Sequence, residues 1–242
     1  MIRYIDEPGM ISPTVRDLGV DTAVTTFSQK IFNAMAAKHN AKKVFEINGC
    51  VTTPVYEIEF GGKRILIYQS YIGAPAAVGD AEEIFGAGVK NLIAFGICGA
   101  LVDMPIKTVI VPTVAYRDEG TSYHYVPATE CINIENADKM AKHLNSCGLN
   151  TVKGGTWTTD GFYRETRTRL AEMKSAGCVA VDMECSALQA MSNFRKKNFY
   201  TFFISADSLA GDEWEPNYIR GNLATDISAL SAEAAIKLAA SL

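Results

Sequence analysis

Carboxylic acid side chains follow two apolar runs of this sequence, where their chemistry could act on a ligand. Asp207 comes just after the apolar run 199–205, and Asp182 and Glu184 flank Met183 in a second apolar setting. A carboxyl at the end of a buried strand is well placed to act as a general acid, which cleavage of an N-glycosidic bond needs because the departing base is a poor anion. A carboxylate also has two acceptor oxygens and suits the vicinal hydroxyl groups of a sugar. The plainer interpretation of each acid is a cap on the helix or turn that follows.

An aromatic and cationic segment occupies residues 158–166. Phe162 and Tyr163 could stack on a planar ring, and Arg164 offers a contact to an anion or a carbonyl group. The alternative is a helix cap at Asp160 with Phe162 buried beneath it. Both interpretations stay open from the residue types alone.

Two more segments contain residue types that could bind a ligand. Residues 116–125 mix both charge signs, hydroxyls and the imidazole of His124, which could orient a hydroxyl or an anion. A hydrogen-bonded surface turn fits that composition equally well. The segment Gly96–Ala100 would allow a ligand to approach the backbone closely, but a plain turn at a strand exit is the more common case. It has no dinucleotide or triphosphate signature.

Apolar runs alternate with helical patterns, and these elements must position the residues above. We expect a hairpin at 55–60 and 64–70 around Gly61-Gly62, buried strands at 91–97, 108–114 and 199–205, and helices at 75–88, 136–146, 164–176, 184–197 and 217–242. This alternation predicts an α/β fold with a mixed, largely parallel sheet covered on both faces, in one domain over residues 1–242. Ligand sites of such sheets lie beyond the carboxyl ends of the strands.

Composition argues against several classes of function. The chain has 242 residues and a formal net charge of −4, so it lacks the basic excess that a nucleic-acid partner requires. No apolar run approaches the length of a membrane span, and the first nine residues lack the apolar core of a signal peptide, so we expect a cytoplasmic protein. The three histidines have no metal-ligand spacing, which predicts no metal site. The six cysteines form no C-x-x-C pair and are expected to be reduced core thiols.

Four motifs in order resemble those of the purine nucleoside and uridine phosphorylase superfamily, which also contains the methylthioadenosine nucleosidases. Residues 72–77 resemble its glycine-rich turn, residues 95–100 its phosphate-site strand end, residues 181–184 its Met-Glu ribose motif, and residues 205–207 the Ser-Asp of its purine-acting members. The resemblance covers roughly residues 65–209. It implies a three-layer α/β/α fold of the phosphorylase/hydrolase type, and no cofactor other than inorganic phosphate as co-substrate.

The resemblance also implies roles for individual residues. Glu184 would bind the ribose hydroxyls, with Met183 packed on the sugar face. Phe162 would stack on the base, with Cys98 and Gly99 contributing to the base site. Asp207 would protonate or hydrogen-bond the purine ring as the bond breaks.

The chain departs from the family pattern at the phosphate positions. The strand-end Arg and the Ser or Thr that usually bind phosphate are replaced by Ala94 and Ile97, and the N-terminal Gly-Asp-Pro-x-Arg loop is missing. If the protein uses phosphate, other residues must bind it. The candidates for this anion site are Arg117, His124, Arg164 and Arg167. The Gln and Arg of uridine-specific members fall on Thr166 and Thr168, which favours purine over uracil, while Arg164 and Arg167 keep uridine open as the alternative substrate.

Three functions remain open from the sequence. The leading hypothesis is a nucleoside phosphorylase that uses phosphate to release a free base and ribose 1-phosphate. The second is a nucleoside hydrolase of the same fold, and the third is a non-catalytic nucleoside-binding protein. The resemblance implies a homo-oligomer, a dimer or a hexamer, with a small-molecule nucleoside and phosphate as the other partners.

Overall fold

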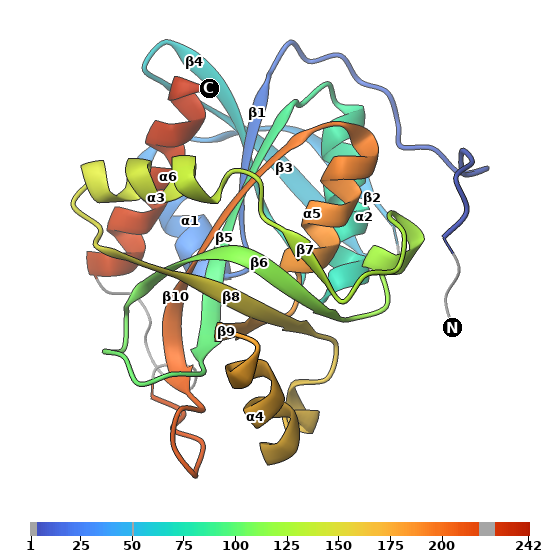
Figure 1. The fold of residues 1–242 in the computed structure, drawn as a ribbon. Coiled ribbons are helices and arrows are strands. Elements are labelled where there is room, and N and C mark those ends of the chain that lie inside the picture. The colour runs from blue at the N-terminus through green and yellow to red at the C-terminus, as the bar shows by residue number, and fades with distance from the viewer. Residues whose placement is uncertain (1–3, 50, 218–225) are drawn as a thin grey trace.

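Strands and helices alternate along the whole chain in the computed structural model, which describes residues 4–49, 51–217 and 226–242 (Figure 1). The first half contains β1 (Thr22–Thr26), α1 (Gln29–Lys38), β2 (Lys42–Asn48), β3 (Thr52–Phe60), β4 (Lys63–Gln69), α2 (Ala74–Gly86), β5 (Asn91–Ala100) and β6 (Val109–Asp118). The second half contains the short 3-10 helix η1 (Ser122–His124), β7 (Cys131–Asn133), α3 (Ala137–Ser146), β8 (Thr151–Thr159), η2 (Phe162–Arg164), α4 (Arg167–Ser175), β9 (Cys178–Asp182), α5 (Cys185–Arg195), β10 (Asn198–Ser208) and α6 (Asp226–Ser241).

The strands form one mixed sheet in the order β10-β6-β8-β9-β5-β1-β4-β3-β2, with β7 paired to β6. Strands β4, β1, β5 and β10 run parallel to one another, and so do β6, β8 and β9. Strand β10 pairs with both β5 and β6, so the strands β5, β10, β6, β8 and β9 close into a ring. At the end of β5, Gly99 and Ala100 pair with β9 on one side and with β10 on the other.

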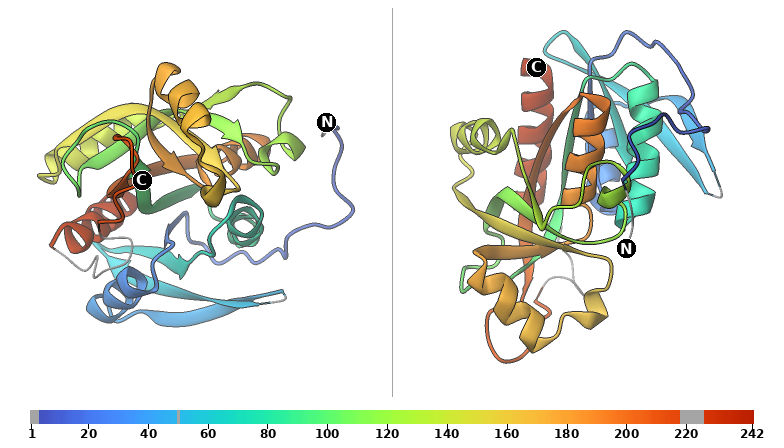
Figure 2. Two further views of the ribbon diagram at one scale, coloured as in Figure 1. Left: turned by 90° about the horizontal axis from the view of Figure 1, so that it is seen from below. Right: turned by 45° about the vertical axis from the view of Figure 1, so that its right-hand side comes forward.

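Helices cover the sheet on two sides. Helices α1, α3 and α6 pack together on one side and α2 and α5 on the other, while α4 lies below the ring beside β9 (Figures 1 and 2). The three layers confirm the predicted α/β class with its mixed, largely parallel sheet. Among the described residues, no helix combines the length and the apolar character that crossing a membrane requires.

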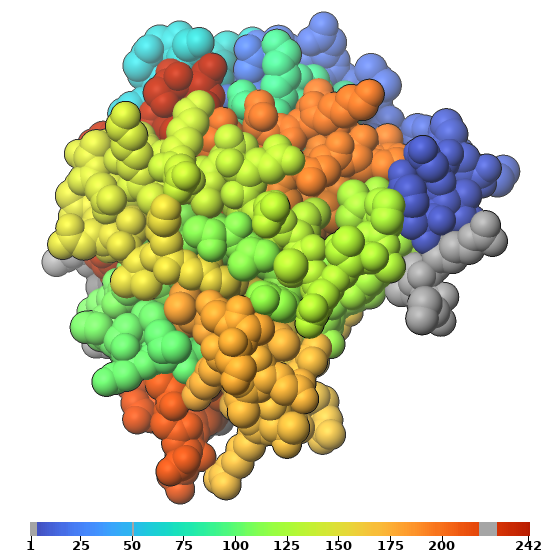
Figure 3. Space-filling model, viewed as in Figure 1, coloured from blue at the N-terminus to red at the C-terminus, as the bar shows by residue number. Residues whose placement is uncertain are grey.

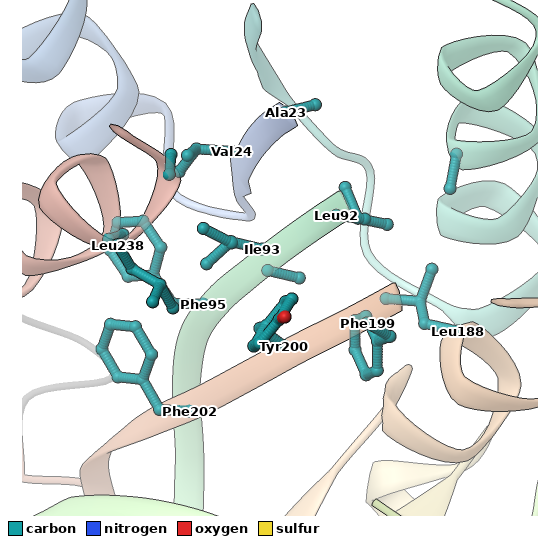
Figure 4. Packing of buried hydrophobic residues seen from close by; sticks show 14 of the residues in the cluster. Ala23, Val24, Leu92, Ile93, Phe95, Leu188, Phe199, Tyr200, Phe202 and Leu238 are labelled. Atoms are coloured by element: carbon teal, nitrogen blue, oxygen red, sulfur yellow. The ribbon is translucent and has the colours of Figure 1, made fainter. Parts of the chain in front are cut away.

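The centre of the core lies along β5 and β10, whose side chains are buried on both faces. The rings of Phe95 and Phe202 stack with centroids 5.2 Å apart. Figure 4 shows Leu238 of α6 beside Phe95 on one face, and Leu188 of α5 beside Phe199 on the other. Burial on both faces explains why these runs are continuously apolar rather than alternating.

The predicted hairpin is confirmed. Strands β3 and β4 pair antiparallel up to Phe60 opposite Lys63, which leaves Gly61 and Gly62 as a two-residue turn. Both glycines have positive φ, +59° and +74°. A two-residue turn of this type matches the twist of the strands and needs positive φ at both positions, which explains the glycine pair.

The prediction of a turn at Gly96–Ala100 is wrong, because β5 continues to Ala100. The glycines serve close packing inside the sheet instead. A Cβ atom on Gly96 would lie 2.8 Å from Cδ2 of Phe27, and one on Gly99 would lie 2.8 Å from Cγ1 of Val181. Any larger side chain at either position would push these neighbours away.

Helix α4 begins at Arg167 rather than at the predicted Arg164. Thr166 caps it, with its hydroxyl accepting a hydrogen bond from the N–H of Arg169 at 3.4 Å, and residues 162–164 form the separate turn η2. The other predicted helices occur with shifts of a few residues, except that part of the C-terminal one, residues 218–225, lies outside the described residues. The five described cysteines are free, with Cys98, Cys178 and Cys185 buried, and Cys50 lies outside the described residues.

Candidate functional site

The predicted acid and the predicted base-site residues meet where β5 and β10 end. Asp207 pairs with Gly99, and Ser205 pairs with Cys98. Ala206 is an extra residue in β10 at this point, so the register shifts by one. The same Gly99 pairs on its other side with Val181 of β9. Met183 and Glu184, which follow β9, therefore come close to the end of β5, where Asp207 of β10 also pairs.

Asp207 is a buried acid, and among the described residues one side-chain donor binds to it. Its side chain is 7% exposed, and Nε1–H of Trp214 donates a hydrogen bond of 2.7 Å to its Oδ2. Burial raises the pKa of Asp207 above that of an ordinary aspartate, although the Trp214 hydrogen bond acts in the opposite direction. A raised pKa is what a general acid near neutral pH needs, since the group must be able to donate a proton.

Asp182 serves the structure of the site rather than its chemistry. Its Oδ1 accepts hydrogen bonds from the hydroxyls of Thr156 and Thr158, both at 2.9 Å. Its Oδ2 accepts from the N–H groups of Glu184 and Cys185, at 2.8 and 2.6 Å. Four donors occupy this carboxylate, so the cap interpretation holds for Asp182: it ties the start of α5 to β8.

Glu184 joins two of the motifs that are far apart in the sequence. Its side chain is buried, 8% exposed, and its Oε1 accepts a hydrogen bond of 2.6 Å from the N–H of Gly73. Gly73 has a φ of +101°, which directs this N–H in a way that other residues rarely allow. Burial, followed by the nearby charge of Asp182, raises the pKa of Glu184 to about 8. The glycine-rich turn before α2 thus helps to hold the carboxyl expected to bind the sugar, and the neighbouring Met183 is half-buried.

Phe162 is exposed rather than buried, so the interpretation that places it beneath a helix cap is wrong. Its side chain is 52% exposed in η2, and its ring lies 4.1 Å from that of Tyr163 at an angle of 37°. Asp160 does not cap a helix; its Oδ2 accepts a hydrogen bond of 3.0 Å from the N–H of Gly120. The exposed aromatic pair offers a surface for a planar ring.

Arg117 lies near the end of β6, and its side chain is packed into the loop that follows this strand. Its side chain is 5% exposed, Nε donates to Ser122 Oγ at 2.8 Å, and one terminal nitrogen donates to Pro127 O and Thr129 Oγ1 at 2.8 and 2.9 Å. The guanidinium also stacks on the ring of Tyr123 at 4.1 Å. These contacts support an ordering role for Arg117, and its role in anion binding stays a prediction.

The loop around Arg117 is anchored to α5 by a residue that sequence reasoning missed. The buried carboxylate of Glu119 accepts hydrogen bonds from the N–H of Ser122 at 2.9 Å and from the hydroxyl of Ser186 at 2.8 Å. Ser186 lies in the first turn of α5, two residues after Glu184. His124 is exposed at the end of η1.

The two remaining predicted anion ligands, Arg164 and Arg167, differ in their contacts. Arg164 is exposed and its guanidinium makes no hydrogen bond or ion pair with the described residues, whereas Arg167 donates to the backbone oxygen of Asp212 at 3.2 Å. On β5, Ala94 is buried and Ile97 is 38% exposed, so neither position supplies a ligand for phosphate. The four candidate ligands do not form one cluster through hydrogen bonds in the described residues.

Two functional candidates had no signal in the sequence. Trp214 is seven residues after Asp207, in the loop that follows β10, and its indole binds the acid directly. Glu165 is half-buried, and burial together with the charge of Asp207 raises its pKa to about 7. The turn between Ser208 and Glu215 brings Trp214 back to Asp207, whereas Glu165 comes from a segment that is distant in the sequence. No group of three or more His, Cys, Asp or Glu among the described residues is arranged to hold a metal ion.

Comparison with known proteins identifies the family of the chain. The sequence profile of the Phosphorylase superfamily matches residues 21–242. Purine nucleoside phosphorylases DeoD-type from Bacillus cereus, Bacillus thuringiensis and Bacillus mycoides are each 27% identical to the chain over 183 residues, covering 74% of this chain and 78% of each relative. With a match over nearly its whole length, this chain belongs to the Phosphorylase superfamily.

Proposed function

We propose that this protein is a nucleoside phosphorylase that splits purine nucleosides with inorganic phosphate into free base and ribose 1-phosphate. The observation that carries the proposal is the pair of buried acids, Asp207 and Glu184, beside the end of β5, each in the motif expected for its role. The raised pKa of Asp207 suits its role as a general acid. The names of the relatives, purine nucleoside phosphorylases, support the same reaction class.

In the proposed reaction, a phosphate oxygen forms a bond to C1′ of the sugar as the bond from C1′ to the base nitrogen breaks. The electron pair of the broken bond passes to the base, and Asp207 delivers a proton to a ring nitrogen so that the base leaves neutral. Glu184 accepts hydrogen bonds from the ribose hydroxyls. These hydrogen bonds and the positive charge that develops on the sugar both favour the ionised form of Glu184, so they lower its pKa from the value of about 8 in the free protein. The proton of the incoming phosphate balances the one that Asp207 gives up.

A purine base is favoured by the residues that follow Phe162. Thr166 and Thr168 occupy the positions at which uridine-specific relatives are expected to have Gln and Arg. The hydroxyl of Thr166 is used in the cap of α4, where it accepts from the N–H of Arg169. The exposed ring of Phe162 offers stacking area without selecting a pyrimidine.

A hydrolase of the same fold is the second candidate, and a specific observation favours it. Ile97 exposes an apolar side chain at the strand position expected to bind phosphate, and Ala94 is buried. Water would then replace phosphate as the nucleophile, and ribose would replace ribose 1-phosphate as the product. A non-catalytic binding protein is disfavoured because both acids of the expected motifs, Asp207 and Glu184, are present and buried.

The test is base release from adenosine, inosine, guanosine and uridine, each with and without phosphate, with analysis of the sugar product. Strict phosphate dependence and ribose 1-phosphate would support the phosphorylase. Equal rates without phosphate and free ribose would replace it by the hydrolase. No base release from any of the four, in a protein that still binds them, would leave the binding protein.

We further propose a homodimer or homohexamer that acts in the cytoplasm. Residues 14–18 are held against the end of α2, where the N–H of Arg16 donates to Gly86 O at 2.9 Å. The segment before them runs along the outside of the molecule with the apolar side chains of Met10 and Ile11 exposed, a surface that a second copy could cover (Figures 1 and 2). Free thiols at all five described cysteines fit a reducing compartment. Sedimentation velocity tests the assembly, and a monomer at micromolar concentration would refute it.

A further inference from the structure

The loop after β10 is held in place by hydrogen bonds within itself and from helix α4. Ser208 and Glu215 pair through two backbone hydrogen bonds of 3.0 and 2.9 Å, so the chain turns back on itself between them. From α4, the ammonium group of Lys174 donates to the carbonyl oxygens of Leu209 and Ala210, both at 2.9 Å. In Figures 1 and 3 this loop and α4 lie side by side at the lower edge of the molecule.

Trp214 lies in this loop with its polar edge directed inward. Its Nε1–H donates a hydrogen bond of 2.7 Å to Oδ2 of Asp207, whereas the residue as a whole is 44% exposed. A tryptophan ring stabilises a fold chiefly by its burial, and this ring keeps much of its surface in water. Packing in the core therefore does not account for a tryptophan at this position, but the contact of its N–H with the buried acid does.

An indole N–H can donate a hydrogen bond but cannot accept one, and this affects where Asp207 carries its proton. In a protonated carboxyl group, one oxygen bears the proton and the other is the better acceptor. Because Oδ2 accepts from Trp214, the proton is favoured on Oδ1. Once the proton has left, the same hydrogen bond stabilises the negative charge of the carboxylate.

Oδ1 of Asp207 lies beside the strand that is expected to form the base site. It is 3.5 Å from the position that a Cβ atom on Gly99 would take, so the glycine leaves space next to it. Among the described residues, no side chain donates a hydrogen bond to Oδ1. One oxygen of the acid is thus oriented by the protein, and the other is available to a base.

We propose that Trp214 is a positioning residue for the general acid: its indole N–H holds Oδ2 of Asp207, so that the acid presents its proton on Oδ1, on the side of Gly99. Lys174 and the backbone pair at the base of the loop keep the indole at this place. The inference rests on the proposed cleavage of purine nucleosides, and it adds the residue that prepares the acid for proton transfer.

Substitution Trp214→Phe tests the proposal, because it keeps an aromatic ring in the loop and removes the N–H donor. At a pH at which Asp207 is protonated, kcat for a purine nucleoside should fall by about 10-fold, the usual contribution of one hydrogen bond to a charged group. The KM for the nucleoside should change by less than about twofold, since the lost contact is to the acid and not to the substrate.

The pH profile of kcat separates positioning from a purely structural role. The hydrogen bond from Trp214 lowers the pKa of Asp207, so removal of the donor raises this pKa. A general acid acts in its protonated form, and the alkaline limb of the profile should therefore move to higher pH in Trp214→Phe. The other titratable or charged groups that act on this acid or bind its loop are unchanged in the variant: Glu165, Cys98, Lys174 and Arg167.

The matched control is Trp157→Phe. Trp157 is the second tryptophan of the chain, and its Nε1–H also donates to an aspartate, Oδ2 of Asp118, at 2.9 Å. This variant should leave the alkaline limb where it is in the wild type, and melting temperatures show that each variant is folded. With base still released, a limb that shifts in both variants or in neither would overturn the role of Trp214. A fall in kcat without a shift of the limb would overturn it as well.

A second measurement does not depend on catalysis. In Trp157→Phe, Trp214 is the one tryptophan left in the chain, so the indole emission reports on the acid to which it is bound. This emission should titrate with pH, and adding Asp207→Asn in the same background should abolish the titration. Absence of base release from every nucleoside would overturn the proposed function. Emission that titrates equally with and without Asp207→Asn would instead overturn the positioning role.

Discussion

At the scale of single residues, the chemistry depends on where each acid keeps its proton. Asp207 and Glu184 are both buried, but their partners differ: an indole N–H binds Asp207, and a backbone N–H binds Glu184. Asp207 must donate a proton, and Glu184 must accept hydrogen bonds from hydroxyls. Each role gives a separate prediction.

Substitution Asp207→Asn should lower the turnover of purine nucleosides by about 10²–10⁴-fold, the usual contribution of a general acid. The amide has no acidic proton, but its oxygen can still accept from Trp214 and so keep the loop in place. Initial rates of base release measure the effect, and an unchanged melting temperature serves as the folding control. Turnover equal to that of the wild type would remove Asp207 from the mechanism.

Glu184 should make stability depend on pH. Its pKa of about 8 in the folded protein lies above the ordinary value of 4.5, so the folded state holds this proton more tightly than the unfolded chain. The contribution of this proton to the free energy of unfolding is complete below pH 4.5 and is lost as the pH rises to 8. Between pH 5 and 8 the loss reaches at most about 4 kcal/mol, at about 1.4 kcal/mol per pH unit. Urea unfolding at several pH values should therefore show a flatter profile for Glu184→Gln than for the wild type. Parallel profiles would mean that Glu184 is ionised throughout.

At the scale of elements, the loop between β6 and β7 is ordered from within by Arg117 and fixed to α5 by Glu119. Lysine cannot reproduce the planar set of donors that binds Ser122, Pro127 and Thr129. Substitution Arg117→Lys should therefore lower the free energy of unfolding by roughly 2–3 kcal/mol, because buried acceptors lose their partners. Urea denaturation measures this loss.

The same variant distinguishes the two roles considered for Arg117. If the guanidinium only orders the loop after β6, it does not contact phosphate. The KM for phosphate should then change less than about twofold in Arg117→Lys. A large increase in the KM for phosphate with stability unchanged would support the anion role instead.

At the scale of the whole molecule, the stacked rings of Phe95 and Phe202 join the open sheet to the closed ring of strands. Both rings are fully buried, so Phe202→Ala should lower the free energy of unfolding by about 3–5 kcal/mol through lost packing and the cavity it leaves. Guanidinium denaturation measures the change. The control Leu230→Ala, at an exposed position of α6, should cost less than about 1 kcal/mol. Equal losses at both positions would mean that β5 and β10 are not the centre of the core.

Local patterns predicted a large part of this fold. The hairpin at Gly61-Gly62, the buried strands β5 and β10, and the helices α2, α3 and α5 follow from turn chemistry and from continuous or periodic apolar runs. Strands β1, β2, β7 and β9 and helix α1 were not predicted, and α4 begins three residues later than predicted, because short strands, exposed edge strands and capped turns have weak local patterns. The Gly96–Ala100 segment was assigned to a turn because glycine favours turns locally, whereas its neighbours Phe27 and Val181 are known only once the sheet is assembled.

By itself, the sequence determined the class of the fold and the motifs of the site, because these depend on residue types within short stretches of chain. The tertiary structure decided which atoms meet. The N–H of Gly73 donates a hydrogen bond to Glu184, which is 111 residues away in the sequence. The guanidinium of Arg117 donates into the loop that follows β6. The charge of Asp207 raises the pKa of Glu165. Buried polar groups must find partners wherever packing brings them, and in this protein several of those partners are distant in the sequence. The physical reason is that burial sets the pKa and the availability of an acid, and burial is a property of the assembled sheet and helices.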